Sequence, residues 1–156
     1  EPGKCIAANA GILVTRVTFL KTGGEKKFVI VDAGMNDLIR PSLYDAFHFI
    51  WPASVRPEHV PSARCRDMAG EMQGFQKVDV VGPICETADF FARERLMPPV
   101  QRGDLLAVFT AGAYGFTMAS NYNARPLAAE ALVDGEKATL IRRRQSYDEM
   151  VSPEQV

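Results

Sequence analysis

The stretch "ILVTRVTFLKTGGEKKFVIVDAG", residues 12–34, decides the fold class of this chain. Residues 12–21 and 27–34 are rich in β-branched and aromatic side chains, which favour strands. The "TGGE" between them supplies the small, flexible residues of a turn. Two strand-forming segments joined by a short glycine-containing turn predict an antiparallel hairpin.

Further strands are expected downstream of this hairpin. "QKVDVVGP" at 76–83 reads as a strand that Gly-Pro stops, and "DLLAVFTAGAY" at 104–114 reads as a buried strand. "ALVDGEKATLIRR" at 131–143 places Asp134-Gly135 between two strand-forming segments. Asp-Gly is a preferred dipeptide for a two-residue hairpin turn, so a second hairpin is predicted there.

Helices are expected to be few. Residues 40–50 read as a short helix, because Pro41 suits the first helical position and apolar residues recur on one face. Pro52 would end that helix, residues 52–76 look irregular, and a short tail helix is expected around 147–150. The predicted fold is all-β, a Greek-key-like barrel or sandwich with one or two short helices.

The composition excludes several classes of protein. The 156 residues are 47% hydrophobic and 24% charged with a net charge of −1, which fits one globular domain without a general attraction to nucleic acid or membranes. The apolar runs are far shorter than the roughly 20 residues of a membrane span. No signal peptide is recognised at the start of the chain. We therefore expect a cytoplasmic protein without nucleic-acid or membrane partners.

The number and spacing of the cysteines and histidines argue against a metal-binding site. The chain has three cysteines without C-x-x-C spacing (Cys5, Cys65 and Cys85), so neither a disulfide framework nor a zinc site is expected. The two histidines, His48 and His59, have no partner at a recognisable sequence spacing. No metal ligand is predicted.

Two short segments carry cations that suit anionic ligands. "EPGK" at 1–4 joins a glycine turn to a cation, an arrangement that can hold a phosphate, although a plain turn fits these residues better. Arg40 and Tyr44, one helical turn apart, would point the same way. Arginine suits a carboxylate ligand, but an exposed arginine beside an amphipathic tyrosine explains the pair more simply.

Two other segments suit proton transfer and ring contacts. In "GPICET" an ordinary thiol at Cys85 is protonated at neutral pH and can donate a proton, and Glu86 can pair with an ammonium group. Alone, the pair reads as a packed cysteine beside a solvated acid. Tyr114 lies among Ala and Gly residues, which indicates a close backbone approach; both a ligand contact and a bulge beside the core stay open. The arginines at 142–144 read as a solvated strand end.

Taken in order, five segments resemble one known family: "EPGK…ANAG", "DAGMNDLIRPSLY", "VVGPICETADF", "GDLLAVFTAGAYGFTMASNYNARP" and "LIRRRQSYDEM". The chain is similar to the C-terminal part of the diaminopimelate decarboxylase family, which are pyridoxal-phosphate (PLP) enzymes of the alanine racemase-like fold type. The resemblance covers nearly all residues and is weakest at 52–76. It implies that residues 1–156 form one C-terminal β domain, with 1–5 ending the last motif of an absent N-terminal β/α barrel.

The resemblance also implies a cofactor and a shared site. In this family the barrel binds most of the PLP, as a Schiff base on a lysine, and the active enzyme is a homodimer with sites at its interface. Glu1 matches the partner of the pyridinium nitrogen, and Gly3 and Lys4 match the phosphate-contacting turn. Lys4 stands where the family usually has arginine, so it keeps the charge and loses the planar fork. Tyr114 matches a position that touches cofactor and substrate.

The remaining matched positions concern the substrate, meso-2,6-diaminopimelate, which the family converts to L-lysine and CO2. Arg40 and Tyr44, together with Lys4, match substrate-binding positions, Cys85 matches the proton donor and Glu86 matches a substrate contact. Chemically, an arginine suits the distal carboxylate of this substrate and a glutamate its distal ammonium.

Two alternatives stay open: a related decarboxylase of another basic amino acid, of the ornithine or arginine type, and a non-catalytic interaction module of the same fold. Ornithine has no distal carboxylate for the arginine. The chain has six lysines (Lys4, Lys21, Lys26, Lys27, Lys77 and Lys137), and none lies in a sequence resembling the Schiff-base lysine. We therefore expect this polypeptide alone to be inactive.

Overall fold

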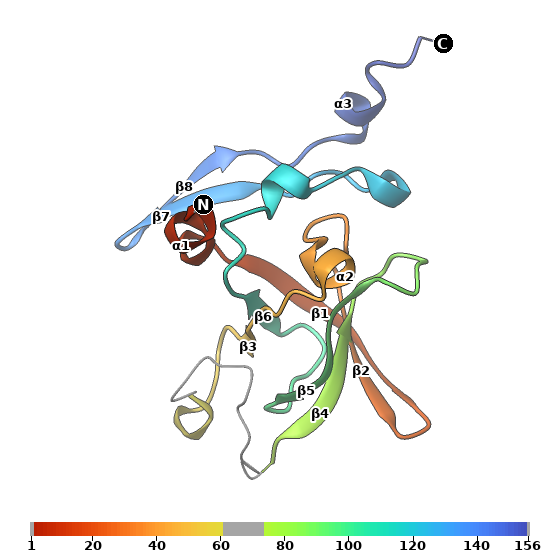
Figure 1. Ribbon diagram of the computed structural model, residues 1–156, viewed down its shortest axis with the longest axis vertical. Helices are drawn as coiled ribbons and strands as arrows, with labels where there is room; N and C mark the ends of the chain where they lie inside the picture. The colour runs from red at the N-terminus through yellow and green to blue at the C-terminus, as the bar shows by residue number, and fades with distance from the viewer. Residues whose placement is uncertain (1, 61–73, 156) are drawn as a thin grey trace.

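A six-stranded sheet forms the body of the protein in the computed structural model, which describes residues 2–60 and 74–155 (Figure 1). Its strand order is β3-β6-β1-β2-β4-β5, and it curls into a nearly closed barrel. The strands are β1 (Leu13–Gly23), β2 (Lys26–Val31), β3 (Ile50–Pro52), β4 (Gln76–Val81), β5 (Phe90–Met97) and β6 (Leu105–Val108). The predicted all-β, barrel-like fold is confirmed.

The hairpin of β1 and β2 forms the middle of this sheet. The two strands pair antiparallel, while β2 and β4 run parallel because the chain crosses over between them. Alternate apolar residues of several strands point inward, as the period of a β-strand requires. They form one core with Leu38: Val17, Val29, Val31, Ala33, Ile50, Val78, Val80, Phe91, Ala92, Met97, Leu106 and Val108.

The two edges of the sheet, β3 and β5, are joined by a side chain and a helix. Arg95 on β5 donates a hydrogen bond of 2.8 Å to the carbonyl of His48, two residues before β3 begins. The same guanidinium lies 4.2 Å from the centroid of the Phe47 ring, which is close enough for a cation–π contact. Helix α2 (Arg40–Tyr44) lies against β5 and covers the same edge.

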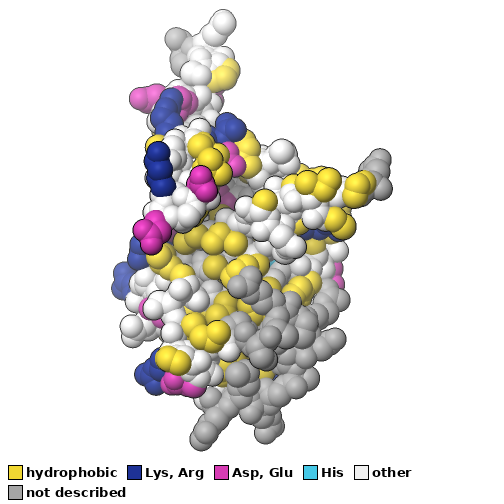
Figure 2. Space-filling model, turned by 90° about the vertical axis from the view of Figure 1, so that its left-hand side faces the viewer, with side chains coloured by type: hydrophobic (Ala, Val, Ile, Leu, Met, Phe, Trp, Pro, Cys, Tyr) yellow, Lys and Arg dark blue, Asp and Glu magenta, His cyan; other side chains and the backbone are white. Residues whose placement is uncertain are grey.

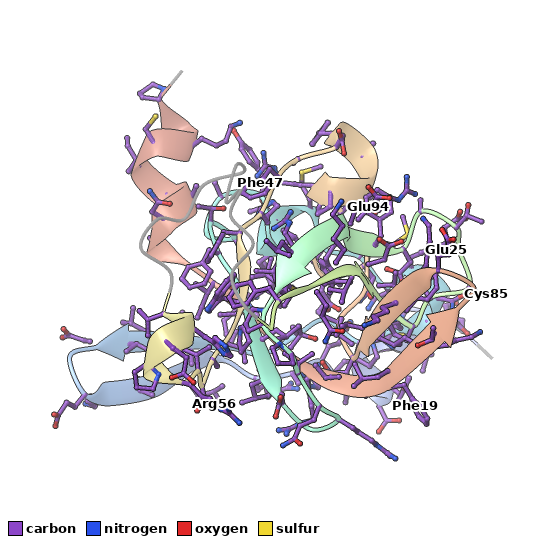
Figure 3. All side chains as sticks on the ribbon, turned by 90° about the horizontal axis from the view of Figure 1, so that it is seen from below. Phe19, Glu25, Phe47, Arg56, Cys85 and Glu94 are labelled. Carbon is purple, nitrogen blue, oxygen red and sulfur yellow. The ribbon has the colours of Figure 1, made fainter. Side chains whose placement is uncertain are left out.

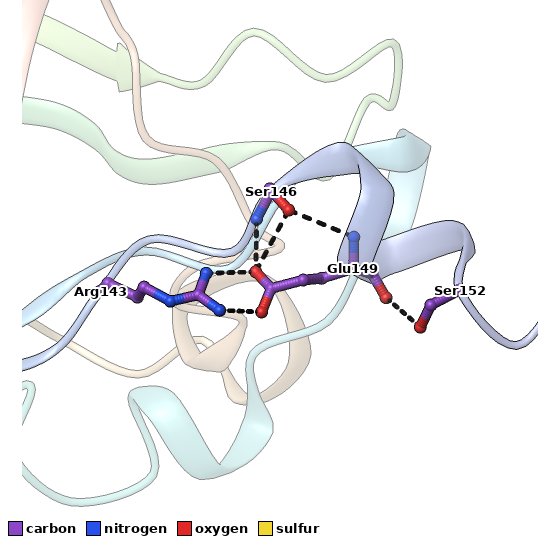
Figure 4. A network of polar contacts seen from close by, with 4 residues as sticks. All are labelled: Arg143, Ser146, Glu149 and Ser152. Carbon is purple, nitrogen blue, oxygen red and sulfur yellow. Dashed lines mark hydrogen bonds and ion pairs between the residues drawn. The ribbon is translucent and has the colours of Figure 1, made fainter.

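A separate hairpin, β7 (Glu130–Asp134) and β8 (Lys137–Arg142), forms the predicted Asp-Gly turn, in which Gly135 has a φ of 57°. After it comes α3 (Tyr147–Val151), which confirms the expected tail helix. Ser146 and Glu149 form a capping box at its start, and Arg143 holds both carboxylate oxygens of Glu149 (Figure 4). Of the described helices, none is long and apolar enough to cross a membrane.

The helix predicted at 40–50 is wrong beyond Tyr44. Asp45 has a φ of 51°, a left-handed conformation that ends α2 after five residues. The chain then turns back, and residues 50–52 pair with β6 as strand β3. Of the apolar residues that suggested the helix, Ile50 is buried in the barrel whereas Leu43 is exposed, so their spacing does not mark one buried helix face.

Three other sequence expectations need correction. The strand predicted at 104–114 ends at Val108, before Thr110 with its φ of 59°. Strand β5 was not predicted at all. The region 52–76 contains a 3-10 turn, η2 (Pro57–His59), and Gln76 already belongs to β4; residues 61–73, with Cys65, lie outside the described part.

The chain start also differs from the expected turn. Residues Gly3–Ala7 form the short helix α1, followed by a 3-10 turn, η1 (Ala8–Ala10). Two further 3-10 turns, η3 (Phe116–Met118) and η4 (Tyr122–Ala124), lead from the barrel to the second hairpin. Figure 1 shows α1 and the β7–β8 hairpin above the barrel, and Figure 3 shows that they lie apart from each other.

Candidate active-site surfaces

An open cavity of about 590 Å³ gathers four of the residues singled out in the sequence: Lys4, Arg40, Tyr44 and Tyr114. They come from three separate segments, namely α1, α2 and the turn after β6. The cavity is completed by Asp45, Ala46, Phe47 and Met118. The fold thus places two cations and two tyrosine hydroxyls around one space.

A contact between two backbone segments explains why Lys4 and Tyr114 line the same cavity. The N–H of Gly112 donates to the carbonyl of Ala8 at 3.1 Å, and a Cβ at Gly112 would collide with the carbonyl of Ala7. The close backbone approach predicted for this glycine-rich turn is confirmed. Tyr114 itself has a φ of 62°, an unusual conformation for a non-glycine residue that clusters at functional sites.

Arg40 is the most enclosed charged group of the cavity. Its residue is only 9% exposed, and its guanidinium carbon lies 5.7 Å from the centroid of the Tyr114 ring. Nη1 faces Nε2 of His48 at 3.3 Å, while the buried Nε has no hydrogen-bond partner among the described residues. A guanidinium has five N–H donors, so Arg40 retains capacity to bind an anion in the cavity.

His48 is a residue that the sequence reasoning missed. It is fully buried, and its Nδ1 lies 2.8 Å from the carbonyl oxygen of Phe109. Burial is the main cause that lowers the pKa of His48; the Phe109 contact opposes this, and the charges of Arg40 and Arg95 add to it. No spacing in the sequence pointed to this residue, because α2 ends at Tyr44 and its contacts depend on the turn that follows.

Cys85 and Glu86 lie elsewhere, on the exposed loop between β4 and β5. Neither residue lines the cavity. In Figure 3 Phe47, a lining residue, lies between α1 and α2, and Cys85 lies at the opposite edge of the view from α1. The Cys85 thiol is free and exposed in this chain, so it does not pack in the core of the barrel.

The buried carboxylate of Asp89 accepts two backbone hydrogen bonds at the base of the Cys85 loop. One oxygen accepts from the N–H of Met35 at 2.7 Å, and the other accepts from the N–H of Ile84 at 2.6 Å. Burial raises the pKa of Asp89, and these two N–H groups oppose the rise. A Cβ at Gly82 would collide with this carboxylate, so a larger residue there would have to displace Asp89 from its two hydrogen bonds.

The surroundings of Glu86 favour its ionised form. The Thr87 hydroxyl is the main cause that lowers the pKa of this exposed carboxyl, and the N–H of Ala88 adds to it. The Ser42 hydroxyl donates to the Ala88 carbonyl and so ties the loop to α2. The loop therefore presents an ionised carboxylate and a thiol to whatever approaches it.

Two of the residues expected to touch a cofactor offer donors that suit a phosphate. Lys4 supplies an ammonium and Tyr114 a hydroxyl on the wall of one cavity, a donor set that suits a phosphate. Gly3 lies in the first turn of α1, and the space around its Cα is open. Glu1 lies outside the described residues.

The barrel-like sheet and the match to a family model together define the class of protein, the sheet domain of pyridoxal-dependent decarboxylases. Residues 5–112 match the family model described as "Pyridoxal-dependent decarboxylase, C-terminal sheet domain", so the chain belongs to that family. Among curated relatives, it is 52% identical over 153 residues to the diaminopimelate decarboxylase of Aquifex aeolicus and 51% identical over 156 residues to that of Vibrio cholerae.

The chain spans about a third of these relatives: it aligns over 98% and 100% of its own length, but over 33% and 34% of theirs. Solved structures agree. A diaminopimelate decarboxylase from M. jannaschii in complex with L-lysine has a TM-score of 0.84 and 35% identity, covering 98% of this chain and 32% of that one. One from Helicobacter pylori, also complexed with L-lysine, has a TM-score of 0.80 and 37% identity, covering 96% and 33%.

Proposed function

We propose that this chain is the C-terminal domain of a PLP-dependent decarboxylase that converts meso-2,6-diaminopimelate to L-lysine and CO2. One observation carries the proposal: the nearly buried Arg40, with spare N–H donors, faces an open cavity in a chain about half identical to diaminopimelate decarboxylases. In a full-length protein, residues 1–156 would form one domain, with 1–5 continuing from an N-terminal β/α barrel.

The charges of this chain suit the far end of that substrate. Diaminopimelate carries a second carboxylate and a second ammonium far from the reacting carbon. Arg40 offers the planar donor fork that binds a carboxylate, with the Tyr44 and Tyr114 hydroxyls and the Lys4 ammonium on the same cavity. The ionised Glu86 suits the distal ammonium. A substrate with no distal carboxylate would leave Arg40 unpaired.

The separation of the two surfaces supports a site shared between two copies. Arg40 lines the cavity, whereas Cys85 and Glu86 lie apart from it on the β4–β5 loop. A homodimer that places the loop of one subunit over the cavity of the other would unite all three residues. In that arrangement the Cys85 thiol would deliver a proton to the carbon that has lost CO2.

The cofactor of this family fits the residues present. PLP withdraws electrons from the reacting carbon and thereby makes loss of CO2 possible. Lys4 and Tyr114 would hold its phosphate together with Gly3, and Glu1 would pair with the ring nitrogen. Most of its contacts, and the lysine that binds it covalently, would belong to the barrel. This chain alone should therefore give no lysine–PLP absorbance band, and its appearance would contradict the proposal.

The exposed apolar side chains support a partner surface for the barrel. Figure 2 shows hydrophobic side chains gathered over the face from which α1 projects. Several large apolar residues of α1, of the β7–β8 hairpin and of the start of β1 with the residue before it are more than half exposed: Ile6, Ile12, Val14, Leu132, Val133, Leu140 and Ile141. Apolar exposure on this scale is typical of a surface that another domain covers. We place the assembled enzyme in the cytoplasm.

Release of CO2 by the purified full-length protein tests the function. With PLP present, meso-diaminopimelate should be decarboxylated and L-ornithine and L-arginine should not. Arg40→Ala should raise the KM for meso-diaminopimelate at least about tenfold, because a hydrogen-bonded charge is lost. Preferred turnover of L-ornithine or L-arginine would assign a related decarboxylase instead, and no turnover of any of them would favour a non-catalytic module.

A further inference from the structure

A buried histidine stands behind the arginine of the cavity. His48 is fully buried between Arg40 and the carbonyl of Phe109. Its Nε2 lies 3.3 Å from Nη1 of Arg40, and its Nδ1 lies 2.8 Å from the Phe109 oxygen. Thr110 Oγ1 lies 3.3 Å from Nδ1 and donates to the Phe109 carbonyl as well.

These contacts permit only one neutral tautomer. A guanidinium has no acceptor, so Nε2 must accept the hydrogen from Arg40. A carbonyl has no hydrogen to donate, so Nδ1 must carry the proton and donate it to Phe109. The two hydrogen bonds of His48 therefore link the backbone after β6, at Phe109, to the guanidinium of Arg40.

We propose that His48 is a positioning residue for substrate recognition: its neutral Nδ1–H tautomer fixes the guanidinium of Arg40 so that this group meets the distal carboxylate of the substrate in one orientation. The inference rests on the proposed function and adds to it the residue that orients the specificity contact. His48 itself need not touch the substrate, because Arg40 lies between it and the cavity.

The electrostatic surroundings of His48 favour the neutral ring. Arg40 on α2 faces Nε2, and Arg95 on β5 donates to the backbone carbonyl of His48 at 2.8 Å. Both groups are cations, and with burial they lower the pKa of His48 below its ordinary value of 6.5. Protonation would turn Nε2 into a donor that opposes Nη1 of Arg40, so acid would release the guanidinium.

Two substitutions of His48 distinguish the role of Nδ1 from the role of Nε2. In His48→Asn the short amide can still donate to Phe109 but cannot reach Arg40. In His48→Gln the longer amide can place its oxygen near the position of Nε2. In the full-length enzyme with PLP, His48→Asn should raise the KM for meso-diaminopimelate about tenfold with kcat within about twofold, and His48→Gln should restore KM to within about threefold of the unmodified enzyme.

A double substitution tests whether His48 acts through Arg40. If it does, His48→Asn should raise KM no further once Arg40→Ala is present. The pH profile gives a second readout: kcat/KM should fall as acid protonates His48, and His48→Gln should lack that acid limb. Should His48→Asn fail to fold, as judged by its urea unfolding transition, the acid limb of His48→Gln decides the question.

The outcomes distinguish this inference from the function on which it rests. Absence of diaminopimelate turnover, or an unchanged KM in Arg40→Ala, would overturn the proposed substrate contact and the positioning role with it. A raised KM in Arg40→Ala combined with a normal KM in His48→Asn would overturn only the role of His48. Full additivity of the two substitutions, or an acid limb retained in His48→Gln, would do the same.

Discussion

The backbone N–H of Gly112 donates to the carbonyl of Ala8 across 3.1 Å, which ties the start of the chain to the turn after β6. The neighbouring Ala111 N–H donates to the carbonyl of Gly11 at 2.9 Å and extends the contact. Lys4 precedes the first of these residues and Tyr114 follows the last, so the contact sets the width of the cavity between them.

Gly112→Ala should open that contact. The new Cβ would collide with the carbonyl of Ala7, so the backbone must move apart, at a cost of about 1–3 kcal/mol in the free energy of unfolding. In the full-length enzyme the affinity for PLP should also fall, since Lys4 and Tyr114 separate. Urea unfolding and a PLP titration measure the two effects. Gly23→Ala is the matched control, because its Cβ would meet only Phe28 at 3.5 Å; equal stability of the two variants would contradict the prediction.

Asp89→Asn should loosen the Cys85 loop. Both carboxylate oxygens accept backbone N–H groups, from Met35 and Ile84, and an amide would set its own NH2 against one of them. We expect a loss of about 1–3 kcal/mol in unfolding free energy and faster hydrogen exchange across residues 82–89. Asp134→Asn serves as control, because Asn-Gly forms the same hairpin turn. Unchanged exchange in Asp89→Asn would show that the loop is held by other contacts.

Mixing two impaired full-length variants tests the shared site, when activity is assayed at a substrate concentration well below the raised KM of Arg40→Ala. Arg40→Ala damages the cavity, and Cys85→Ala removes the thiol from the separate loop. If a site combines the cavity of one subunit with the loop of the other, each mixed dimer holds one intact site, so random exchange of subunits should restore about 25% of full activity. CO2 release after co-refolding measures this. No gain in activity over the separate variants, in dimers shown to be mixed, would mean that both residues serve the same subunit.

The contacts of Glu149 with Arg143 and Ser146, which hold the start of α3, should persist in moderately acidic solution. Hydrogen bonding to Arg143 is the main cause that lowers the pKa of Glu149 from 4.5 to about 2, with the N–H of Ser146 adding to it. A carboxyl whose pKa is lower in the folded protein contributes stability that is present above pH 4.5 and lost as pH falls towards 2. The protection factor of the Met150 amide, which donates to the Ser146 carbonyl, should stay constant down to about pH 4 and fall at lower pH.

Glu149→Gln should lower the protection of the Met150 amide from hydrogen exchange at neutral pH as well, because the charged pair with Arg143 is lost. Glu154→Gln is the control, since Glu154 shows no such pairing with an arginine in the described contacts. Both groups are exposed, so global unfolding should barely change in either variant. Equal exchange at Met150 in the two variants would show that α3 does not depend on the Arg143 contact.

Local sequence signals predicted elements whose conformation is fixed by near neighbours. The Asp134-Gly135 turn, the first hairpin and the tail helix appeared as expected, because turn geometry and capping act over a few residues. The local signals gave wrong predictions where burial and pairing with distant strands decided the backbone conformation. The periodicity of residues 40–50 suggested a helix, yet the left-handed Asp45 ends it, and pairing with β6 turns residues 50–52 into a strand. Strand β5 was missed because Arg93 and Arg95 interrupt its apolar pattern.

The sequence by itself determined the family, the fold class and the identities of the chemically capable residues. Segments such as "GPICET" and "LIRPSLY" can be recognised from the order and spacing of their residues, without knowledge of the fold. Only the tertiary structure decided how they group. It joined Lys4, Arg40 and Tyr114 at one cavity, set Cys85 apart on its own loop and placed His48 behind Arg40. The reason is physical: hydrogen bonds between residues far apart in the chain, such as Gly112 to Ala8 and His48 to Phe109, form only once the barrel has closed.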